Sequence, residues 1–282
     1  MASIFLNDRP FFPNQSSVTL QMEQRFRVEV AKLPEPSRLI LYEILSCCVP
    51  TFTPTTFSVA DRMVLATQND REIAFPTPVP MVKLSHVVFG YEEWLQRKYC
   101  LPGFVEVERG DIVVDCGAYV GGFSIAAVKM AAQVHAFEPE GGNFSCLTYN
   151  FRGISNVTLN ELGLYSETRR IGLNISPSSV EHSILTPDDG QVIAVREIDV
   201  MALKDYLQKR NVPKLDFLKI EAEGVELEVF DGLRGLTPRK LAIDVSPERN
   251  GESPAGEFRE RLTSLGYEVR QRAHVMFART EG

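Results

Sequence analysis

The sequence predicts an α/β protein built on a mostly parallel sheet, with an antiparallel strand at its C-terminal end. From residue 111 onward, short apolar segments alternate with amphipathic ones, a pattern typical of a parallel sheet covered by helices on both faces. The first apolar segment, 112–114, leads into a glycine-rich turn that opens a helix. Ligands of such sheets bind at the carboxyl ends of the strands, so we expect the chemistry there.

The elements follow in a regular order. Strands are predicted at 112–114, 134–137, 157–164, 215–220 and 241–245. Helices are predicted at 123–132, 142–151, 200–210, 225–233 and 257–265, the last with Gly266 as its C-cap. Turn signals between residues 169 and 198 indicate an inserted β-hairpin, and two antiparallel strands at 267–272 and 275–278 complete the sheet.

The first 90 residues differ from the rest, because prolines punctuate them and no long strand pattern emerges. We expect a mainly helical N-terminal extension at 1–90 and the main domain at 91–282. Helices are predicted at 21–33 and 37–48, the second with Ser37 as its cap and with Leu41, Ile44, Leu45 and Cys48 facing inward. We expect this extension to pack on the main domain, to act as a substrate lid or to form a homodimer through exposed apolar helix faces.

The composition of the chain indicates which binding partners and which cellular location to expect. The 282 residues carry a formal net charge of −7, which argues against broad binding to nucleic acid. The five cysteines are scattered without a Cys-x-x-Cys pair, which is typical of a reduced, intracellular protein. Neither a signal peptide nor a membrane-spanning segment is visible. The sequence thus predicts a cytoplasmic protein without nucleic-acid or membrane partners.

The turn after the first strand has the pattern Asp115-x-Gly117-x-x-x-Gly121. Gly117 suits a positive φ or a close approach of the backbone to a ligand. A nicotinamide fingerprint requires Gly-x-Gly-x-x-Gly, and Tyr119 takes the place of its second glycine. The carboxylate of Asp115 would repel a pyrophosphate, whereas it suits a ligand with a cationic amine and a neutral ribose. S-adenosylmethionine has both groups.

An acid also ends the second strand. Glu138 lies 23 positions after Asp115 and is placed to accept two hydrogen bonds from ribose hydroxyls. Dinucleotide sites use an acid near the ribose in the same way, so Glu138 does not separate the two kinds of cofactor.

Three segments resemble the FkbM family of S-adenosylmethionine-dependent methyltransferases. The resemblance covers about residues 111–236, and more loosely the chain from Tyr99 to its C-terminus. The three segments are Asp115-Cys116-Gly117-Ala118-Tyr119-Val120-Gly121, Ala136-Phe137-Glu138-Pro139 and Phe217-Leu218-Lys219-Ile220-Glu221-Ala222-Glu223-Gly224-Val225-Glu226. Many class I methyltransferases share the first motif, whereas the third is much more specific to this family. The family usually has aspartate at the position of Glu221 and often a β-branched residue at that of Ala222.

The resemblance implies a Rossmann-like class I methyltransferase sheet. It also implies methyl transfer, usually to a hydroxyl of a small molecule such as a sugar or a polyketide, as in natural product biosynthesis. The cofactor would be S-adenosylmethionine and its product S-adenosylhomocysteine. The residues predicted to bind the cofactor are Asp115, Gly117, Ala118, Tyr119, Gly121, Ser124, Glu138, Pro139, Leu162 and Glu221.

Acidic residues crowd the end of the fourth strand, and such crowding raises the pKa of at least one carboxyl and favours a general base. We expect Glu221 near the methyl group or the acceptor, and Glu223 as a base or as a brace of the loop. Glu226 suits a helix N-terminus. His182, on the inserted hairpin, is a third candidate catalytic residue or a surface histidine. Asp244, at the end of the fifth strand, is a further candidate for the cleft.

Several alternatives remain open at this stage. An N- or C-methyltransferase has the same cofactor motifs, and a non-catalytic adenosylmethionine-binding module has the same fold. A nicotinamide oxidoreductase is disfavoured by the absent fingerprint and by Asp115. No metal is expected, because Glu221 and Glu223 do not form a recognisable metal-binding spacing. The acceptor is predicted to be a small hydroxylated molecule, whose identity the sequence does not encode.

Overall fold

The computed structural model describes residues 25, 28–69, 71–179, 182–185, 191–249 and 251–280. The chain divides into two units, Met1–Tyr91 and Glu92–Gly282. Most of the N-terminal half of the helix predicted at 21–33 lies outside the described residues, while residues 28–31 are helical.

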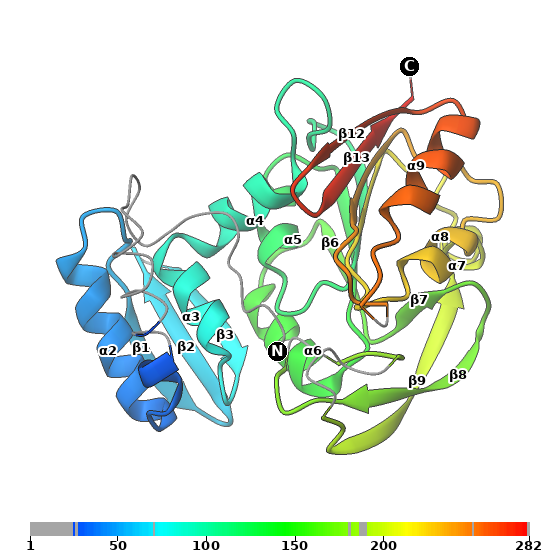
Figure 1. Cartoon of the computed structure of the whole chain (residues 1–282). Helices are drawn as coiled ribbons and strands as arrows, with labels where there is room; N and C mark the ends of the chain where they lie inside the picture. The colour runs from blue at the N-terminus through cyan, green and yellow to red at the C-terminus, as the bar shows by residue number, and fades with distance from the viewer. Residues whose placement is uncertain are drawn as a thin grey trace. The chain divides into compact units, whose positions relative to one another are not determined.

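The described part of the first unit combines helices with a three-stranded antiparallel sheet in the order β1-β2-β3. Its elements are α2 (Glu35–Cys48), β1 (Thr56–Ala60), β2 (Met63–Gln68), β3 (Arg71–Pro76) and α3 (Met81–Val88), and α4 (Tyr91–Tyr99) begins at its last residue (Figure 1). The sequence predicted a mainly helical extension and indicated no strand in it. Strands β2 and β3 each bury three consecutive residues, so no alternation of apolar and polar positions marks them.

Helix α2 differs in detail from its prediction. It follows Pro34 without a side-chain cap, and Ser37 lies within its first turn, so the predicted cap is wrong. The buried face consists of Leu39, Tyr42 and Ser46, whereas Ile44 is exposed. Polar atoms on that face are satisfied: the Ser46 hydroxyl, for example, accepts a hydrogen bond from a backbone N–H. The prediction that the apolar residues of this helix face inward was therefore wrong about which face is buried.

The second unit is built on a seven-stranded sheet, counted over the described residues, in the order β12-β13-β11-β10-β4-β5-β6. Its strands are β4 (Ile112–Cys116), β5 (Gln133–Phe137), β6 (Val157–Asn160), β10 (Phe217–Ile220), β11 (Lys240–Asp244), β12 (Glu268–Arg272) and β13 (Val275–Arg279). Strands β4, β5, β6, β10 and β11 run parallel, and β13 is antiparallel to β11. This topology confirms the predicted mostly parallel sheet with an antiparallel C-terminal strand.

The strand order reverses between β4 and β10. The chain proceeds from β4 outward to β5 and β6 on one side, and later returns on the other side with β10 and β11. In this pair Lys219 lies opposite Asp115 and Ile220 lies opposite Cys116. Such a switch point is where parallel α/β sheets form ligand crevices. The sheet therefore brings Asp115 and the acidic segment that follows β10 to the same edge.

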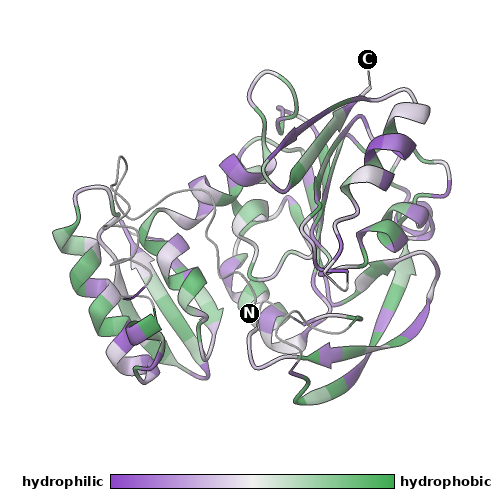
Figure 2. Cartoon of the chain, viewed as in Figure 1, coloured by the Kyte–Doolittle hydropathy of each residue, from purple (hydrophilic) through white to green (hydrophobic). Residues whose placement is uncertain are grey.

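Helices cover both faces of the sheet (Figure 1). They are α5 (Gly122–Ala127) and α6 (Gly141–Asn150) on one face, and α7 (Leu203–Lys209), α8 (Glu226–Asp231) and α9 (Ala255–Ser264) on the other. Val114, Leu218 and Leu241 share a core cluster with residues of α7, α8 and α9, while Ala136 packs with residues of α5 and α6. Hydrophobic colour runs along the strands and mixes with polar colour on the helices (Figure 2). Alternate residues of each strand thus face opposite helical layers.

The predicted inserted β-hairpin is confirmed, and a third strand pairs with it. Strand β8 (Arg169–Ile175) pairs antiparallel with β9 (Ala194–Ala202), and β7 (Gly163–Tyr165) joins them in a separate sheet of order β7-β9-β8. The third predicted strand, 157–164, is therefore split between two sheets. The predicted start of the helix at residue 200 is also wrong, because Val200 and Ala202 are buried strand residues and α7 begins at Leu203.

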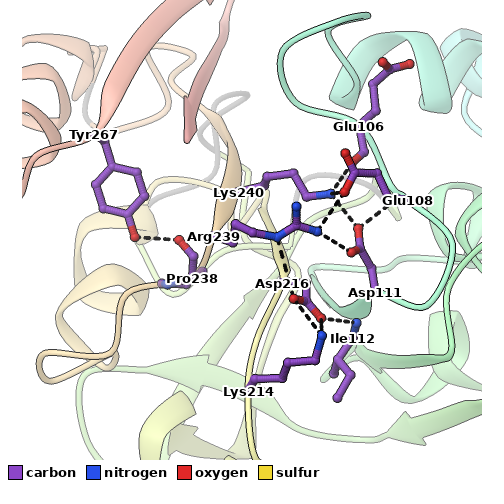
Figure 3. Close-up of polar contacts among 10 residues, drawn as sticks. All are labelled: Glu106, Glu108, Asp111, Ile112, Lys214, Asp216, Pro238, Arg239, Lys240 and Tyr267. Carbon is purple, nitrogen blue, oxygen red and sulfur yellow. Dashed lines mark hydrogen bonds and ion pairs between the residues drawn. The ribbon is translucent and has the colours of Figure 1, made fainter. Parts of the chain in front are cut away.

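A buried ion network joins the strand starts at the amino edge of the sheet (Figure 3). The carboxylate of Asp111 lies 2.6 Å from Arg239 Nη2 and 2.6 Å from Lys240 Nζ. Asp216 accepts a hydrogen bond from the backbone N–H of Ile112 at 2.9 Å. These contacts connect the starts of β4, β10 and β11 at the edge opposite the expected site, and their role is structural.

We predict that Lys240→Met lowers the free energy of unfolding by about 3 kcal/mol, because it removes an ammonium from a buried carboxylate. Lys214→Met is the control, since it breaks an ion pair whose lysine is 59% exposed and should cost less than about 1 kcal/mol. Urea denaturation of both variants measures the two losses. Equal losses would contradict a buried role for Lys240.

Candidate active site

The turn after β4 packs directly on the end of β10. Asp115 is fully buried, with Oδ2 accepting a 2.6 Å hydrogen bond from the Ser124 hydroxyl on α5. Gly117 has a φ of +71°, and a Cβ atom there would lie 1.8 Å from the carbonyl oxygen of Glu221. Gly121 has a φ of +90° and sits where a side chain would collide with Leu147 on α6. Both glycines are therefore required by the backbone.

Lys219 lies between the turn after β4 and the end of β10. Its Nζ donates hydrogen bonds to the carbonyl oxygens of Cys116 and Gly117, at 3.1 and 2.7 Å. The same ammonium pairs with Asp115 Oδ1 at 3.1 Å and with Glu221 Oε2 at 3.2 Å. Burial opposes its charge, but the two carboxylates prevail and raise the pKa of Lys219. Asp115 thus has partners within the chain, and its contact with a ligand amine stays a prediction.

A second lysine approaches Glu221 from α4. Lys98 Nζ lies 2.8 Å from Glu221 Oε1 and 2.8 Å from Asp244 Oδ2. It also lies 4.9 Å from the ring centre of Tyr99. Burial opposes the charge of Lys98, but the carboxylates of Asp244 and Glu221 raise its pKa. Sequence reasoning missed Lys98, because it lies 123 residues from Glu221 and belongs to no motif.

The loop after β10 is braced by Glu226, the first residue of α8. Its Oε1 accepts hydrogen bonds from the backbone N–H groups of Ala222 and Gly224, at 2.8 and 3.1 Å. Burial raises the pKa of Glu226 to about 7, against the opposing effect of these hydrogen bonds. The predicted position of Glu226 at a helix N-terminus is confirmed. Its side chain therefore supports the loop that carries Glu221 and Glu223.

Glu223 is the carboxyl that the predicted crowding affects most clearly. Burial and the neighbouring carboxylates, Glu248 first and then Glu221, raise its pKa well above the usual value. Its backbone has a φ of +49°, and its carbonyl accepts a 2.6 Å hydrogen bond from the Ser183 hydroxyl. Burial and the Asp244 carboxylate likewise raise the pKa of Glu248. The sequence analysis did not include Glu248.

A second acidic position lies at the end of β5. Glu138 Oε2 accepts a 3.0 Å hydrogen bond from the backbone N–H of Tyr119, and Oε1 accepts from Glu140 N and Asn143 Nδ2, at 2.9 and 3.4 Å. Burial raises the pKa of Glu138 to about 7, while these bonds oppose the rise. Asn143 Oδ1 is buried, and no described residue donates a hydrogen bond to it. Spare acceptor capacity here suits a ligand with hydroxyl or amino donors.

The remaining predicted cofactor residues surround this position. Ala118 donates its N–H to Phe137 O at 2.8 Å, which fixes the turn beside β5. The Tyr119 hydroxyl lies 3.0 Å from the Ser179 hydroxyl of the hairpin insertion. Pro139 lies beside β7, since a Cβ atom at Gly163 would lie 3.7 Å from its side chain. Leu162 packs against the core cluster under α7 and α8. Contact of these residues with a cofactor stays a prediction.

His182 contacts residues of the hairpin and of the start of α6. His182 Nδ1 accepts a 3.2 Å hydrogen bond from the backbone N–H of Ser176. Its charged neighbours are Glu140 and Arg196, and burial lowers the pKa of its imidazole. The structure thus places His182 with the hairpin and the start of α6, so its catalytic role stays a prediction.

Within the described ranges, no group of three or more His, Cys, Asp or Glu side chains is arranged to hold a metal ion. None of the described helices is long and apolar enough to cross a membrane.

A model of the methyltransferase FkbM domain matches residues 115–269, more than half of the chain. The chain belongs to the FkbM methyltransferase family. The matched segment contains the β4 turn, Glu138, Lys219 and the loop after β10, whereas Lys98 and Tyr99 on α4 lie outside it.

Two relatives place this FkbM-family methyltransferase among known proteins. It is 25% identical to the 31-O-demethyl-FK506 methyltransferase FkbM of Streptomyces tacrolimicus over 237 residues, which cover 72% of this chain and 90% of that protein. It is 30% identical to the hexuronic acid methyltransferase AglP of Haloferax volcanii over 130 residues, which cover 45% of this chain and 52% of that protein.

Among solved structures, a crystal structure of a methyltransferase FkbM from Methylobacillus flagellatus KT is similar to 70% of this chain. The TM-score is 0.46 at 18% identity, and the match covers 53% of that longer chain. The strand order, with its switch point and its antiparallel strand, is the one expected of a Rossmann-like class I methyltransferase, in agreement with the family.

We predict that Glu226→Ala lowers the free energy of unfolding by about 1–3 kcal/mol, because two N–H groups of the loop lose their acceptor. Glu226→Gln is the matched control, since its amide oxygen accepts the same two hydrogen bonds. Thermal and urea denaturation compare the two variants. A Gln variant as unstable as the Ala variant would show that the negative charge, and not the hydrogen bonding, stabilises the loop.

Proposed function

We propose that the protein transfers the methyl group of S-adenosylmethionine to a hydroxyl oxygen of a small metabolite. One observation carries the proposal: the 115–121 turn contacts two acidic residues at one edge of the sheet. Glu138 lies beside Tyr119, and Glu221 lies beside Gly117. Two relatives, a 31-O-demethyl-FK506 methyltransferase and a hexuronic acid methyltransferase, support a small oxygen-rich acceptor.

The donor set at the end of β5 fits the nucleoside part of this cofactor. Glu138 has three backbone or amide donors on its two oxygens, which leaves room for a further hydroxyl donor. Asn143 Oδ1 is a buried acceptor to which none of the described residues donates, next to that carboxyl. Ribose hydroxyls would satisfy both. In this proposal Gly117, Ala118 and Tyr119 form the wall of the nucleoside site.

The carboxyls after β10 then act on the acceptor. Bound S-adenosylmethionine supplies a methyl group that is already strongly electrophilic. Glu221, whose two oxygens are each paired with a lysine, is held in one orientation and aligns the acceptor hydroxyl. Glu223, with its raised pKa, suits the proton acceptor. Orientation contributes about 7–11 kcal/mol to such reactions, and a positioned base adds roughly 10²–10⁴-fold.

We predict that the protein binds S-adenosylmethionine and S-adenosylhomocysteine, and not NAD, in calorimetric titrations. Affinity for both should fall as the pH drops below about 7, by up to about tenfold per unit, because Glu138 must lose its proton to accept the ribose hydroxyls. Above that pH the carboxyl is ionised and affinity should level off.

The Glu138→Gln variant is the control for this pH dependence. It should bind both nucleosides more weakly and show little change between about pH 6 and pH 8, since the amide does not titrate. Retention of the full pH dependence in this variant would assign it to another group. A wild-type protein that binds NAD but neither sulfur nucleoside would refute the proposed cofactor.

We predict that methyl-labelled S-adenosylmethionine transfers its label to a hydroxyl within a panel of sugars, uronic acids and polyketide alcohols. Glu221→Gln should lower kcat by about 10²-fold or more, because it disturbs the alignment of the acceptor. Glu257→Gln, on the exposed part of α9, is the control and should leave the rate unchanged. Label found on nitrogen or carbon would support the alternative acceptor classes, and binding without transfer to any acceptor would favour a non-catalytic module.

A further inference from the structure

The ion cluster at the carboxyl edge is not balanced in charge. Within the described residues it contains the carboxylates of Asp115, Glu221 and Asp244 and the ammonium groups of Lys98 and Lys219. Every contact between them is 2.8–3.2 Å long. The cluster therefore has one more carboxylate than ammonium, at the edge where a ligand is expected to bind.

The two lysines differ in how firmly they belong to the sheet. The side chain of Lys219 is 2% exposed and is also held by the carbonyl oxygens of Cys116 and Gly117. The side chain of Lys98 is 19% exposed and comes from α4, outside the segment that matches the family. Lys98 bridges Glu221 and Asp244, the carboxylates that follow and end two neighbouring strands. It is thus the more peripheral of the two positive charges.

We propose that Lys98 is a positioning residue that holds Glu221 and Asp244 together and sets the preference of the site for a cationic ligand over a neutral one. The inference rests on the proposed function, because S-adenosylmethionine carries a sulfonium charge that S-adenosylhomocysteine lacks. With Lys98 present, these five groups have a single excess negative charge, and the carboxyls of Glu223 and Glu248, whose pKa values are raised by burial and by neighbouring carboxylates, lie beside them. This excess favours the cofactor while still allowing the neutral product to bind.

The expected effect follows from the distance dependence of charge–charge interactions. At an effective dielectric constant of about 40–80, which suits a partly exposed group, a unit charge about 6 Å away changes the affinity for a cation by roughly three- to tenfold, whereas a neutral ligand responds far less. Loss of the Lys98 charge should therefore raise the ratio of Kd for S-adenosylhomocysteine to Kd for S-adenosylmethionine. Loss of the Glu221 charge should lower the same ratio.

The experiment measures both dissociation constants by calorimetry, at one pH and salt concentration, for the wild type, Lys98→Gln, Lys98→Arg and Glu221→Gln. Glutamine at position 98 keeps a hydrogen-bond donor while it removes the charge. Lys129→Gln is the matched control, because it also removes an ammonium that pairs with a residue of α4, Glu92, at 2.8 Å. We expect the ratio to rise about three- to tenfold in Lys98→Gln, to fall in Glu221→Gln and to stay unchanged in Lys98→Arg and Lys129→Gln.

The outcomes separate this inference from the proposed function. If the wild type binds both nucleosides but the ratio is the same in all variants, the role of Lys98 is refuted and the cofactor stands. An equal shift in Lys98→Arg and Lys98→Gln would also refute it, since geometry and not charge would then be responsible. If Lys98→Gln does not fold, Lys98→Met takes its place in the same comparison, since methionine also removes the charge while keeping a long side chain. Absence of binding in the wild type would refute the cofactor and the inference together.

Discussion

The structure of the second unit depends on one buried ammonium group. Burying Lys219 costs on the order of several kcal/mol, and the cost is offset only because Asp115, Glu221 and two carbonyl oxygens surround it. This arrangement joins β4 to β10 where the strand order reverses. It also brings the carbonyl of Glu221 so close to Gly117 that no side chain fits there. The position of Glu221 is therefore a consequence of the core.

The two edges of the main sheet use charge in different ways. At the amino edge, Asp111 lies between Arg239 and Lys240, and the network has a structural role (Figure 3). At the carboxyl edge, the carboxylates outnumber the ammonium groups within the described cluster, which favours a cationic ligand. The first arrangement is suited to stability and the second to binding, although both consist of the same residue types.

The acidic residues at the carboxyl edge differ in role, because they have different hydrogen-bond partners. Glu226 is occupied by backbone N–H groups of its own loop, so it supports structure. Glu138 keeps spare acceptor capacity next to Asn143 Oδ1, to which none of the described residues donates a hydrogen bond, so it suits a ligand. Burial raises the pKa of both to about 7. A perturbed pKa alone would not have distinguished them, whereas their hydrogen-bond partners do.

The sequence by itself determined the parallel sheet, the β4 turn and the family. These features are local: strand, glycine spacing and acid lie within the motifs at 115–121, 136–139 and 217–226, so their pattern survives in the linear order. The tertiary structure alone decided the position of Lys98, because contacts across 123 residues leave no periodic signal. It also decided the first unit's sheet, whose strands bury consecutive residues, and the inner face of α2, where polar side chains are buried because they are hydrogen-bonded.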